Sequence, residues 1–133
     1  MPRAVARFQI DGVEEEPPYV EDGTVRYVHS QMAKSFTGDI EGSSLVEMLS
    51  VRSEGAGAGY VALERVEGVV QGMRGSFALL HVGTMSLGVQ WGRWPVVAGS
   101  GTAELVGISG EARIDIAPDG AHTLLLDYEL GGR

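Results

Sequence analysis

The sequence of 133 residues contains no cysteine, which excludes a disulfide framework and thiol chemistry. Basic residues are also scarce, because 10 Lys and Arg stand against 18 Asp and Glu and leave a formal net charge of −8. Nucleic acids and anionic membranes are bound mainly through clusters of Lys and Arg. We therefore expect neither kind of partner.

Long hydrophobic runs are absent as well. No run approaches the roughly 18 apolar residues of a membrane helix. The start, MPRAVARFQIDGVEEEPP, has neither the apolar region nor the cleavage site of a signal peptide. The length suits a single domain spanning residues 1–133. We expect a soluble, unprocessed, cytoplasmic protein.

No segment repeats apolar residues with the period of an amphipathic helix. Instead, 20 glycines separate short runs of β-branched and aromatic residues, which is typical of strands joined by tight turns. None of the runs is protected by lysines as an exposed edge would be. The pattern predicts an all-β fold, a closed antiparallel eight-stranded β-barrel with hairpin (meander) connections, in preference to a sandwich. The strand-like runs cover residues 4–13, 25–36, 44–53, 60–85, 86–97, 102–106 and 110–128.

The run 60–85 has the most regular hairpin pattern. A two-residue loop of Gly72 and Met73 suits a type II′ turn, whose first position needs φ > 0. The numbers of opposite residues then sum to 145, so Glu64 lies directly across from His81. The other face carries charged residues that prefer water, so we expect this pair to point inward. An acid and an imidazole in a mostly apolar enclosure are the main indication of a functional site in the sequence.

The pairing of strand 44–53 with the next strand has two possible registers. With a sum of 112, Glu47 faces Arg65 outside and Met48 points inward beside Glu64. With a sum of 111, Glu47 faces Glu64 inside, where one of the two carboxyl pKa values would be strongly raised. The first register avoids burying like charges and is preferred. The second keeps Glu47 as an alternative interior residue.

The last hairpin turns at residues 118–120. Pro118-Asp119-Gly120 fits a three-residue loop with Gly120 at φ > 0, so opposite residues sum to 238. This register points His122 and Tyr128 inward.

Two other kinds of site find little support. The glycine-rich run 54–59 lacks the lysine and the following helix of a phosphate-binding loop. No Gly-x-Ser-x-Gly elbow of a serine hydrolase is present.

Several ordered motifs together resemble the bacterial DUF3224 family over roughly residues 5–130. They are KSFTGDIEGS (34–43), AGYVALERV (58–66), GSF (75–77) followed by His81, GSGT (99–102) with Glu104, and His122 with LDY (126–128). The resemblance implies a small antiparallel barrel similar to allene oxide cyclase and dirigent proteins. Relatives of those proteins include cyclases and isomerases that work without cofactors in an apolar cavity. The family itself supplies no activity. Ala98 stands where the family pattern has proline, and segment 90–94 is unusually rich in tryptophan.

Three functions agree with these observations. The first is a cofactor-independent isomerase or cyclase for a hydrophobic small molecule, in which burial raises the pKa of Glu64 and His81 relays a proton. The second is a barrel that binds such a molecule without changing it. The third is a structural role for a buried Glu-His pair. Glu64 and His81 are the candidate catalytic residues, and the candidate ligand-binding residues are Met48, Tyr60, Phe77, Met85, Trp91, His122 and Tyr128.

We expect no cofactor. A metal site would need Glu64, His81 and His122 to converge, and no closely spaced set of ligands indicates that they do. Partly apolar outer faces, as at Val61 and Leu63, predict a homodimer.

Overall fold

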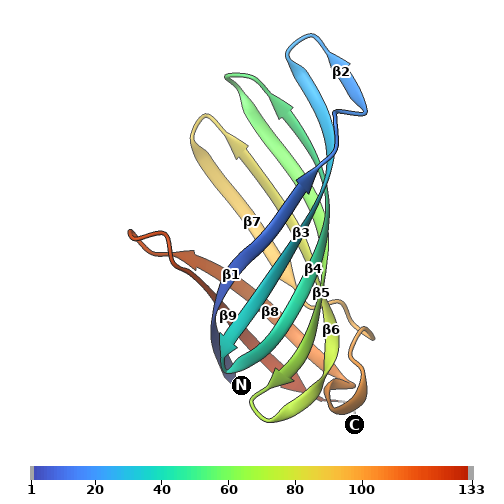
Figure 1. Ribbon diagram of the computed structural model, residues 1–133, viewed down its shortest axis with the longest axis vertical. Coiled ribbons are helices and arrows are strands. Elements are labelled where there is room, and N and C mark those ends of the chain that lie inside the picture. Colours follow the sequence, from blue (N-terminus) through green and yellow to red (C-terminus); the bar gives the residue numbers. More distant parts are fainter. Residues whose placement is uncertain (1, 132–133) are drawn as a thin grey trace.

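The computed structural model describes residues 2–131 and is built almost entirely from antiparallel strands (Figure 1). The elements are β1 (Arg3–Glu15), β2 (Val20–Asp22), β3 (Val25–Gly38), β4 (Ile40–Ser53), β5 (Gly57–Val70), β6 (Met73–Ser86), β7 (Val89–Pro95), the short 3₁₀ helix η1 (Ala103–Leu105), β8 (Ile108–Ile116) and β9 (His122–Leu130). No helix within the described residues is both long and apolar enough to cross a membrane.

The strands form one sheet that closes on itself. Their order is β1-β9-β8-β7-β6-β5-β4-β3-β2, and β1 also pairs with β3. This extra pairing closes a barrel of eight strands, β1 and β3 to β9, and leaves the short β2 outside on β3. From β3 onward each strand pairs with the next along the chain. The predicted closed, eight-stranded antiparallel meander barrel is therefore confirmed.

The packed core lies at one end of the barrel, which we call the closed end. The β3–β4 and β5–β6 turns, η1 and the N-terminal half of β1 gather there (Figure 1). Leu105 of η1 is 1% exposed and packs with Ile40, Val70 and Phe77. Gly75 allows this close approach, because a Cβ atom there would lie 2.2 Å from the backbone oxygen of Thr102. The core therefore seals the closed end.

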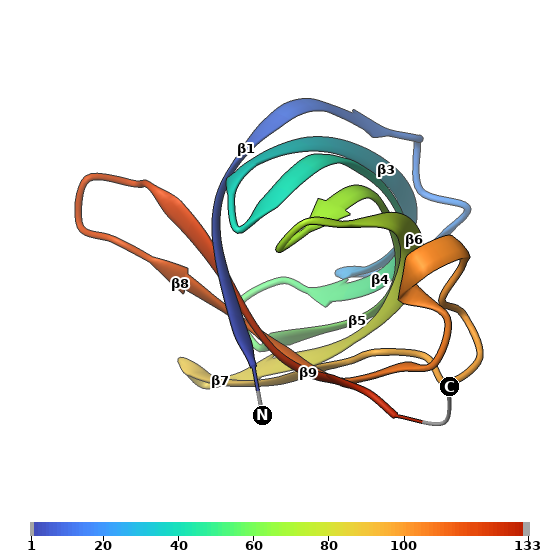
Figure 2. The ribbon, with the colours of Figure 1, turned by 90° about the horizontal axis from the view of Figure 1, so that it is seen from below.

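The opposite half of the barrel is incomplete on one side. β7 pairs with β8 only at Trp94 and Pro95, and β9 pairs with β1 only as far as Phe8 and His122. Beyond these points the β8–β9 hairpin leaves the barrel and projects outward (Figure 2). The remaining strands of that half curve around an interior that opens between β7 and the hairpin.

The β5–β6 turn differs from the predicted one. Its two loop residues are Gln71 and Gly72, with φ of 45° and 86°, so Val70 pairs with Met73 and opposite residues sum to 143. Two positive φ values define a type I′ turn, and the predicted type II′ turn is wrong. Glu64 consequently faces Leu79. Because the slip is two residues, side chains keep their face of the sheet, and Glu64 and His81 still both point inward.

The β4–β5 register also differs from both predicted alternatives. Val46 pairs with Glu64, and Met48 pairs with Ala62, which gives a sum of 110. Strand β5 begins at Gly57 rather than Tyr60, so the connecting loop is only residues 54–56. The preferred register was again wrong by two residues. It nevertheless assigned the side chains of β4 and β5 to the correct inner and outer faces. Glu47 lies outside, so the alternative that buried it is wrong.

The C-terminal part contains one confirmed and one wrong prediction. The β8–β9 hairpin has the predicted sum of 238, with Ile116 opposite His122 and Gly120 at φ of 90°. Residues 102–106, predicted as a strand, instead contain η1. Residue Thr102 explains the difference, because its hydroxyl and carbonyl oxygens accept the backbone N–H groups of Ser76 and Leu105.

Candidate functional site

A buried carboxylate lies where four neighbouring strands meet. Glu64 on β5 is 1% exposed. Its Oε1 accepts His81 Nε2 from β6 at 2.8 Å and Lys34 Nζ from β3 at 3.3 Å. Its Oε2 accepts Ser44 Oγ from β4 at 2.5 Å. Lys34, Ser44 and His81 are themselves buried, so the predicted Glu64–His81 contact exists within a larger polar cluster.

Sequence reasoning missed Lys34 and Ser44. Lys34 lies between Met32 and Phe36 in a strand whose even-numbered residues point inward. The same alternation places Ser44 beside Val46 on the inner face of β4. Period-two alternation on an apolar face was therefore the signal that could have found both. The Lys34 ammonium also lies 4.7 Å from the centre of the Phe8 ring, a favourable cation–π contact.

The charge state of Glu64 differs from the expectation. Burial acts to raise the pKa of Glu64, but the hydrogen bond from His81, the charge of Lys34 and the hydrogen bond from Ser44 together lower it. The predicted rise in pKa is therefore wrong. Glu64 is an ionised acceptor at neutral pH and cannot serve as an acid poised near neutrality. Its chemical effect is to orient His81 and to balance the charge of Lys34.

His81 is the residue of the cluster that still has a ring nitrogen without a hydrogen-bond partner in the described chain. Nε2 is bound to Glu64, whereas Nδ1 bonds to none of residues 2–131 and is not a fully enclosed atom. The imidazole meets the Trp94 ring edge-on, with ring centres 6.2 Å apart and an interplanar angle of 80°. Trp94 is not among the candidate residues predicted from the sequence. It points inward because β6 and β7 pair Gly83 with Gly92, which turns the even-numbered residues of β7 to the interior.

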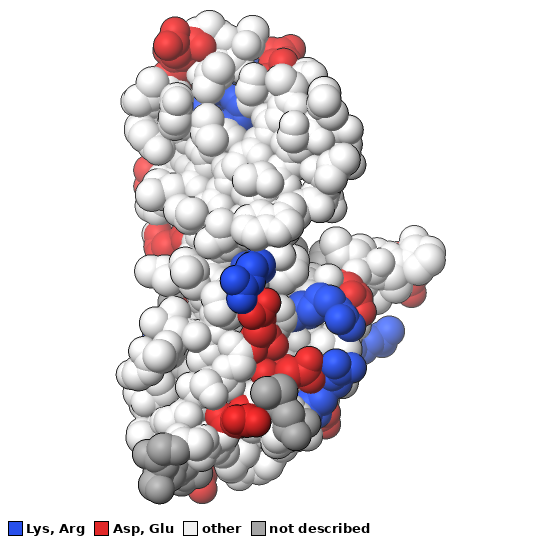
Figure 3. All heavy atoms as spheres, turned by 180° about the vertical axis from the view of Figure 1, so that it is seen from behind, with Lys and Arg blue, Asp and Glu red and all other residues white. Residues whose placement is uncertain are grey.

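Beside Trp94 lies a cavity of about 470 Å³, which we call the side hollow. Its lining is Ala58, Tyr60, Thr84, Met85, Gln90, Trp91, Gly92, Trp94, Arg113 and Ile114, from both sides of the gap between β7 and β8. Figure 3 shows this side of the molecule, with a notch above the projecting hairpin. Charged side chains gather below the notch, and the surface above it is almost free of them (Figure 3).

Two glycines make room for the aromatic walls of the side hollow. A Cβ atom on Gly83 would lie 2.4 Å from the Tyr60 ring, and one on Gly92 would lie 3.3 Å from the Trp94 ring. Because Gly83 and Gly92 are paired across β6 and β7, the two rings occupy neighbouring places on the inner face. The sequence signal for this arrangement is a glycine on each of two adjacent strands.

The predicted ligand-binding residues separate into several groups. Tyr60, Met85 and Trp91 line the side hollow. Trp91 pairs with Thr84 on the outer face and reaches the hollow at its rim. Phe77 belongs instead to the closed-end core.

Tyr128 also lies in the closed-end core, where its hydroxyl donates to Gln71 Oε1. Burial and the charge of Asp39 raise the pKa of this phenol. His122 stacks against Phe8, with ring centres 5.1 Å apart, at a separate hollow. None of the groups of His, Asp and Glu among residues 2–131 is arranged to hold a metal ion.

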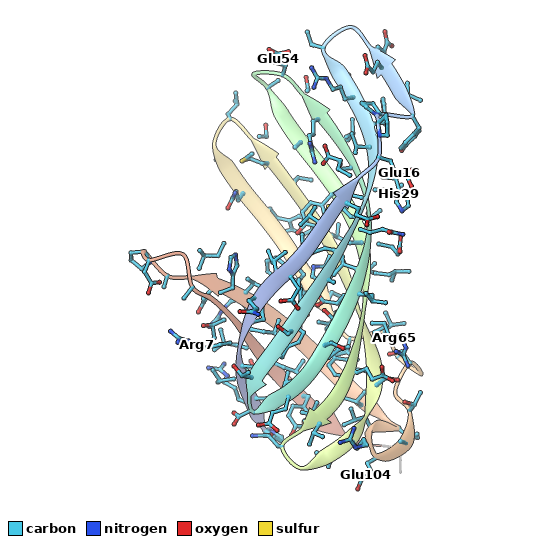
Figure 4. All side chains as sticks on the ribbon, in the orientation of Figure 1. Arg7, Glu16, His29, Glu54, Arg65 and Glu104 are labelled. Carbon is cyan, nitrogen blue, oxygen red and sulfur yellow. The ribbon has the colours of Figure 1, made fainter. Side chains whose placement is uncertain are left out.

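A larger hollow of about 800 Å³, the outer groove, lies on the outside of the barrel. Met48 alternates with Val46 and Ser50 on the inner face of β4, as predicted, and it also borders this groove, whose other lining residues are Glu16, Tyr19, His29, Glu47, Leu49, Val61, Ala62, Leu63 and Leu80. His29 accompanies Glu16 at its edge (Figure 4) and contacts Glu16 at 3.2 Å and Glu47 at 2.8 Å. The hydrogen bond to Glu47, followed by that to Glu16, raises the pKa of His29. This groove is separate from the Glu64 cluster.

Comparison with known proteins agrees with the motifs. The model of the DUF3224 family, described as proteins of unknown function, matches residues 4–128. The chain belongs to the DUF3224 family. A DUF3224 crystal structure from Shewanella oneidensis MR-1, also of unknown function, is 32% identical and covers 100% of this chain and 99% of its own, with a TM-score of 0.92. No curated protein matches the sequence. The DUF3224 resemblance is confirmed, and it brings no activity with it.

Breaking the buried pair should destabilise this DUF3224 barrel strongly. Glu64→Gln leaves the Lys34 ammonium buried without a counter-charge, for which we expect a loss of about 3–5 kcal/mol in the free energy of unfolding. Lys34→Met in the same chain removes the stranded charge, so the double variant should be more stable than Glu64→Gln alone. Urea unfolding of the wild type, both single variants and the double variant measures the coupling.

The exposed pair Arg65–Glu67, at 3.4 Å, provides the control for this cycle. Replacing both residues by glutamine should leave the unfolding midpoint within error, since exposed ion pairs contribute little. Additive effects of Lys34→Met and Glu64→Gln would contradict a coupled cluster.

Proposed function

We propose that this barrel binds one small, largely apolar molecule in the side hollow. The supporting observation is the hollow itself, a cavity of about 470 Å³ walled by Tyr60 and Trp94 beside the His81–Glu64 cluster. Small-molecule sites commonly have about 300–1,000 Å³, mainly apolar walls and a few polar groups. The outer groove is larger but lies on the outside of the sheet, away from the buried polar cluster.

The side chains that line the side hollow indicate which chemical groups of a ligand they would contact. Tyr60, Trp94 and Ile114 offer apolar surface, and Gln90 offers an amide. Trp94 Nε1 is enclosed without a hydrogen-bond partner in the described chain. Buried indole N–H groups usually have an acceptor. A ligand oxygen beside Trp94 would therefore satisfy it after a small movement of the ring.

A second candidate is an isomerase or cyclase at the same place, favoured by the orientation of His81. With Nε2 bound to ionised Glu64, Nδ1 of His81 is the atom that would take a proton from one ligand carbon and return it to another. No cofactor is consumed in such a shift. The similarity to allene oxide cyclase and dirigent barrels stays a prediction from the sequence, and it points to the same class of reaction.

Three further expectations stay predictions. A homodimer would cover the outer apolar side chains of β4 and β5, among them Leu49, Val61 and Leu63, which are 48%, 48% and 56% exposed. The cytoplasmic location and the absence of nucleic-acid or membrane partners continue to rest on composition, with a net charge of −8.

Binding of the neutral dye N-phenyl-1-naphthylamine tests the proposal. We expect its fluorescence to rise saturably with the wild type. Tyr60→Ala should weaken binding about tenfold, because it removes one aromatic wall of the site. Tyr19→Ala, which removes an aromatic ring from the outer groove instead, should leave the affinity unchanged.

Circular dichroism of both variants establishes that they are folded. Loss of dye binding in Tyr19→Ala with normal binding in Tyr60→Ala would move the ligand site to the outer groove. The absence of saturable binding would also contradict the proposal.

The tautomer of His81 tests the catalytic candidate. Long-range ¹H–¹⁵N NMR should show the neutral imidazole of His81 as the tautomer with the proton on Nε2 and a free lone pair on Nδ1, because Glu64 accepts from Nε2. His29, whose Nε2 and Nδ1 contact Glu47 and Glu16, supplies the contrasting spectrum of an imidazole with both ring nitrogens engaged. A proton on Nδ1 of His81 would remove its capacity to act as a base.

A further inference from the structure

A third hollow, of about 350 Å³, lies where β9 leaves β1, and we call it the Arg7 pocket. Its lining includes Arg7, Phe8, Gln9, Ser35, Thr37 and His122. The pocket exists because β9 pairs with β1 only as far as Phe8 and His122, after which the β8–β9 hairpin turns away. It shares no lining residue with the side hollow.

Arg7 is a cation without a counter-charge. The arginines at positions 3, 52, 65, 93 and 113 each pair with a carboxylate. Arg7 has neither an ion pair nor a side-chain hydrogen bond with any residue from 2 to 131. It extends from β1 on the side where the β8–β9 hairpin projects (Figure 4). In a chain of net charge −8, an unpaired guanidinium in a pocket is available to an anion.

The other walls complement a flat anion. The Phe8 and His122 rings meet in a tilted arrangement, with centres 5.1 Å apart and an interplanar angle of 40°, and give the pocket an aromatic side on which His122 is the more exposed ring, since Phe8 is 8% exposed. Gln9 and Ser35 both donate to Asp11 Oδ1, at 3.0 Å and 3.3 Å, so these two lining donors are already engaged and Arg7 is the group that would hold an anion. Thr37 adds a hydroxyl to the lining.

We propose that the Arg7 pocket binds a small aromatic carboxylate. The guanidinium of Arg7 holds the carboxylate through two parallel N–H donors, and the aromatic ring packs against Phe8 and His122. This site is independent of the ligand proposed for the side hollow, because the two hollows share no lining residue.

Benzoate is the probe that tests this inference. Titration of the full ¹⁵N-labelled chain should shift the Arg7 Nε–H and His122 ring resonances saturably. Acetate, which lacks the ring, and benzyl alcohol, which lacks the charge, should each bind at least about tenfold more weakly, since each loses one of the two contacts. Arg7→Gln should lower benzoate affinity by about the same factor.

Arg26→Gln is the matched control, because Arg26 is also an exposed β-strand arginine with no ion pair in the described chain and does not line the pocket. Its benzoate affinity should equal that of the wild type. Equal losses in Arg7→Gln and Arg26→Gln would reveal a general charge effect and overturn the inference. Benzyl alcohol binding as tightly as benzoate, or no saturable shift at Arg7 and His122, would also overturn it.

Discussion

The rest of the structure depends on one buried carboxylate. An ionised group inside a protein is strongly unfavourable unless partners surround it. Glu64 receives those partners from three other strands, Lys34 on β3, Ser44 on β4 and His81 on β6. A one-residue slip at any of these interfaces would turn a donor to the outer face and leave the charge exposed to the apolar interior. The cluster therefore favours one register across half of the barrel.

The same carboxylate couples stability to pH. The pKa of Glu64 is lower in the folded chain than in an unfolded chain, where it is about 4.3. The ionised cluster therefore contributes stability above that value, and the contribution is lost as pH falls through the lower folded pKa. Lys34 and His81 supply the donors that make this direction possible. The interior is polar at this level and apolar at the closed end.

The barrel consequently has two halves with different tasks. Leu105 and Phe77 belong to the packed apolar core that fills the closed end. In the other half, the departure of the β8–β9 hairpin opens the wall, and paired glycines let Tyr60 and Trp94 lie flat on the sheet. A filled core holds the strands in place while the open half offers surface. This division suits a binding protein, because the packed core holds the strands rigidly while the open half lets a ligand reach the site.

Side-chain alternation made the faces of the strands predictable from the sequence, and the β8–β9 register was predicted correctly, but the two central registers were not. Both central registers were wrong by two residues, an error that moves partners along the strand and leaves every side chain on its face. The error at the β5–β6 turn came from Gln71, which adopts φ of 45° where glycine or asparagine is usual. Tertiary bonds offset that strain, since Gln71 donates to the Arg3 carbonyl and accepts from Tyr128.

The sequence predicted the central Glu64–His81 pair of the site correctly. Its prediction for the pKa of Glu64 was wrong. Glu64 and His81 share a face in any register whose opposite residues sum to an odd number, as in both the predicted 145 and the observed 143, so their common face followed from alternation. The direction of the Glu64 pKa shift was predicted wrongly because only desolvation was considered, whereas the hydrogen bond from His81, the charge of Lys34 and the hydrogen bond from Ser44 together outweigh it. Trp94 was missed because its inward orientation follows from the pairing of Gly83 with Gly92, a register that was not predicted. The side hollow depends on where two hairpins separate, which local patterns do not encode.

The protonation of Glu64 tests the central claim most directly. Following the ¹³C resonance of its side-chain carboxyl through an acid titration of the folded protein measures the pKa without a ligand or a substitution. The account predicts a value below the ordinary 4.3 or so of a glutamate, because three donors stabilise the ionised form. A value above that figure would mean that desolvation prevails, and that Glu64 is a buried neutral acid rather than the anion that holds the four strands together.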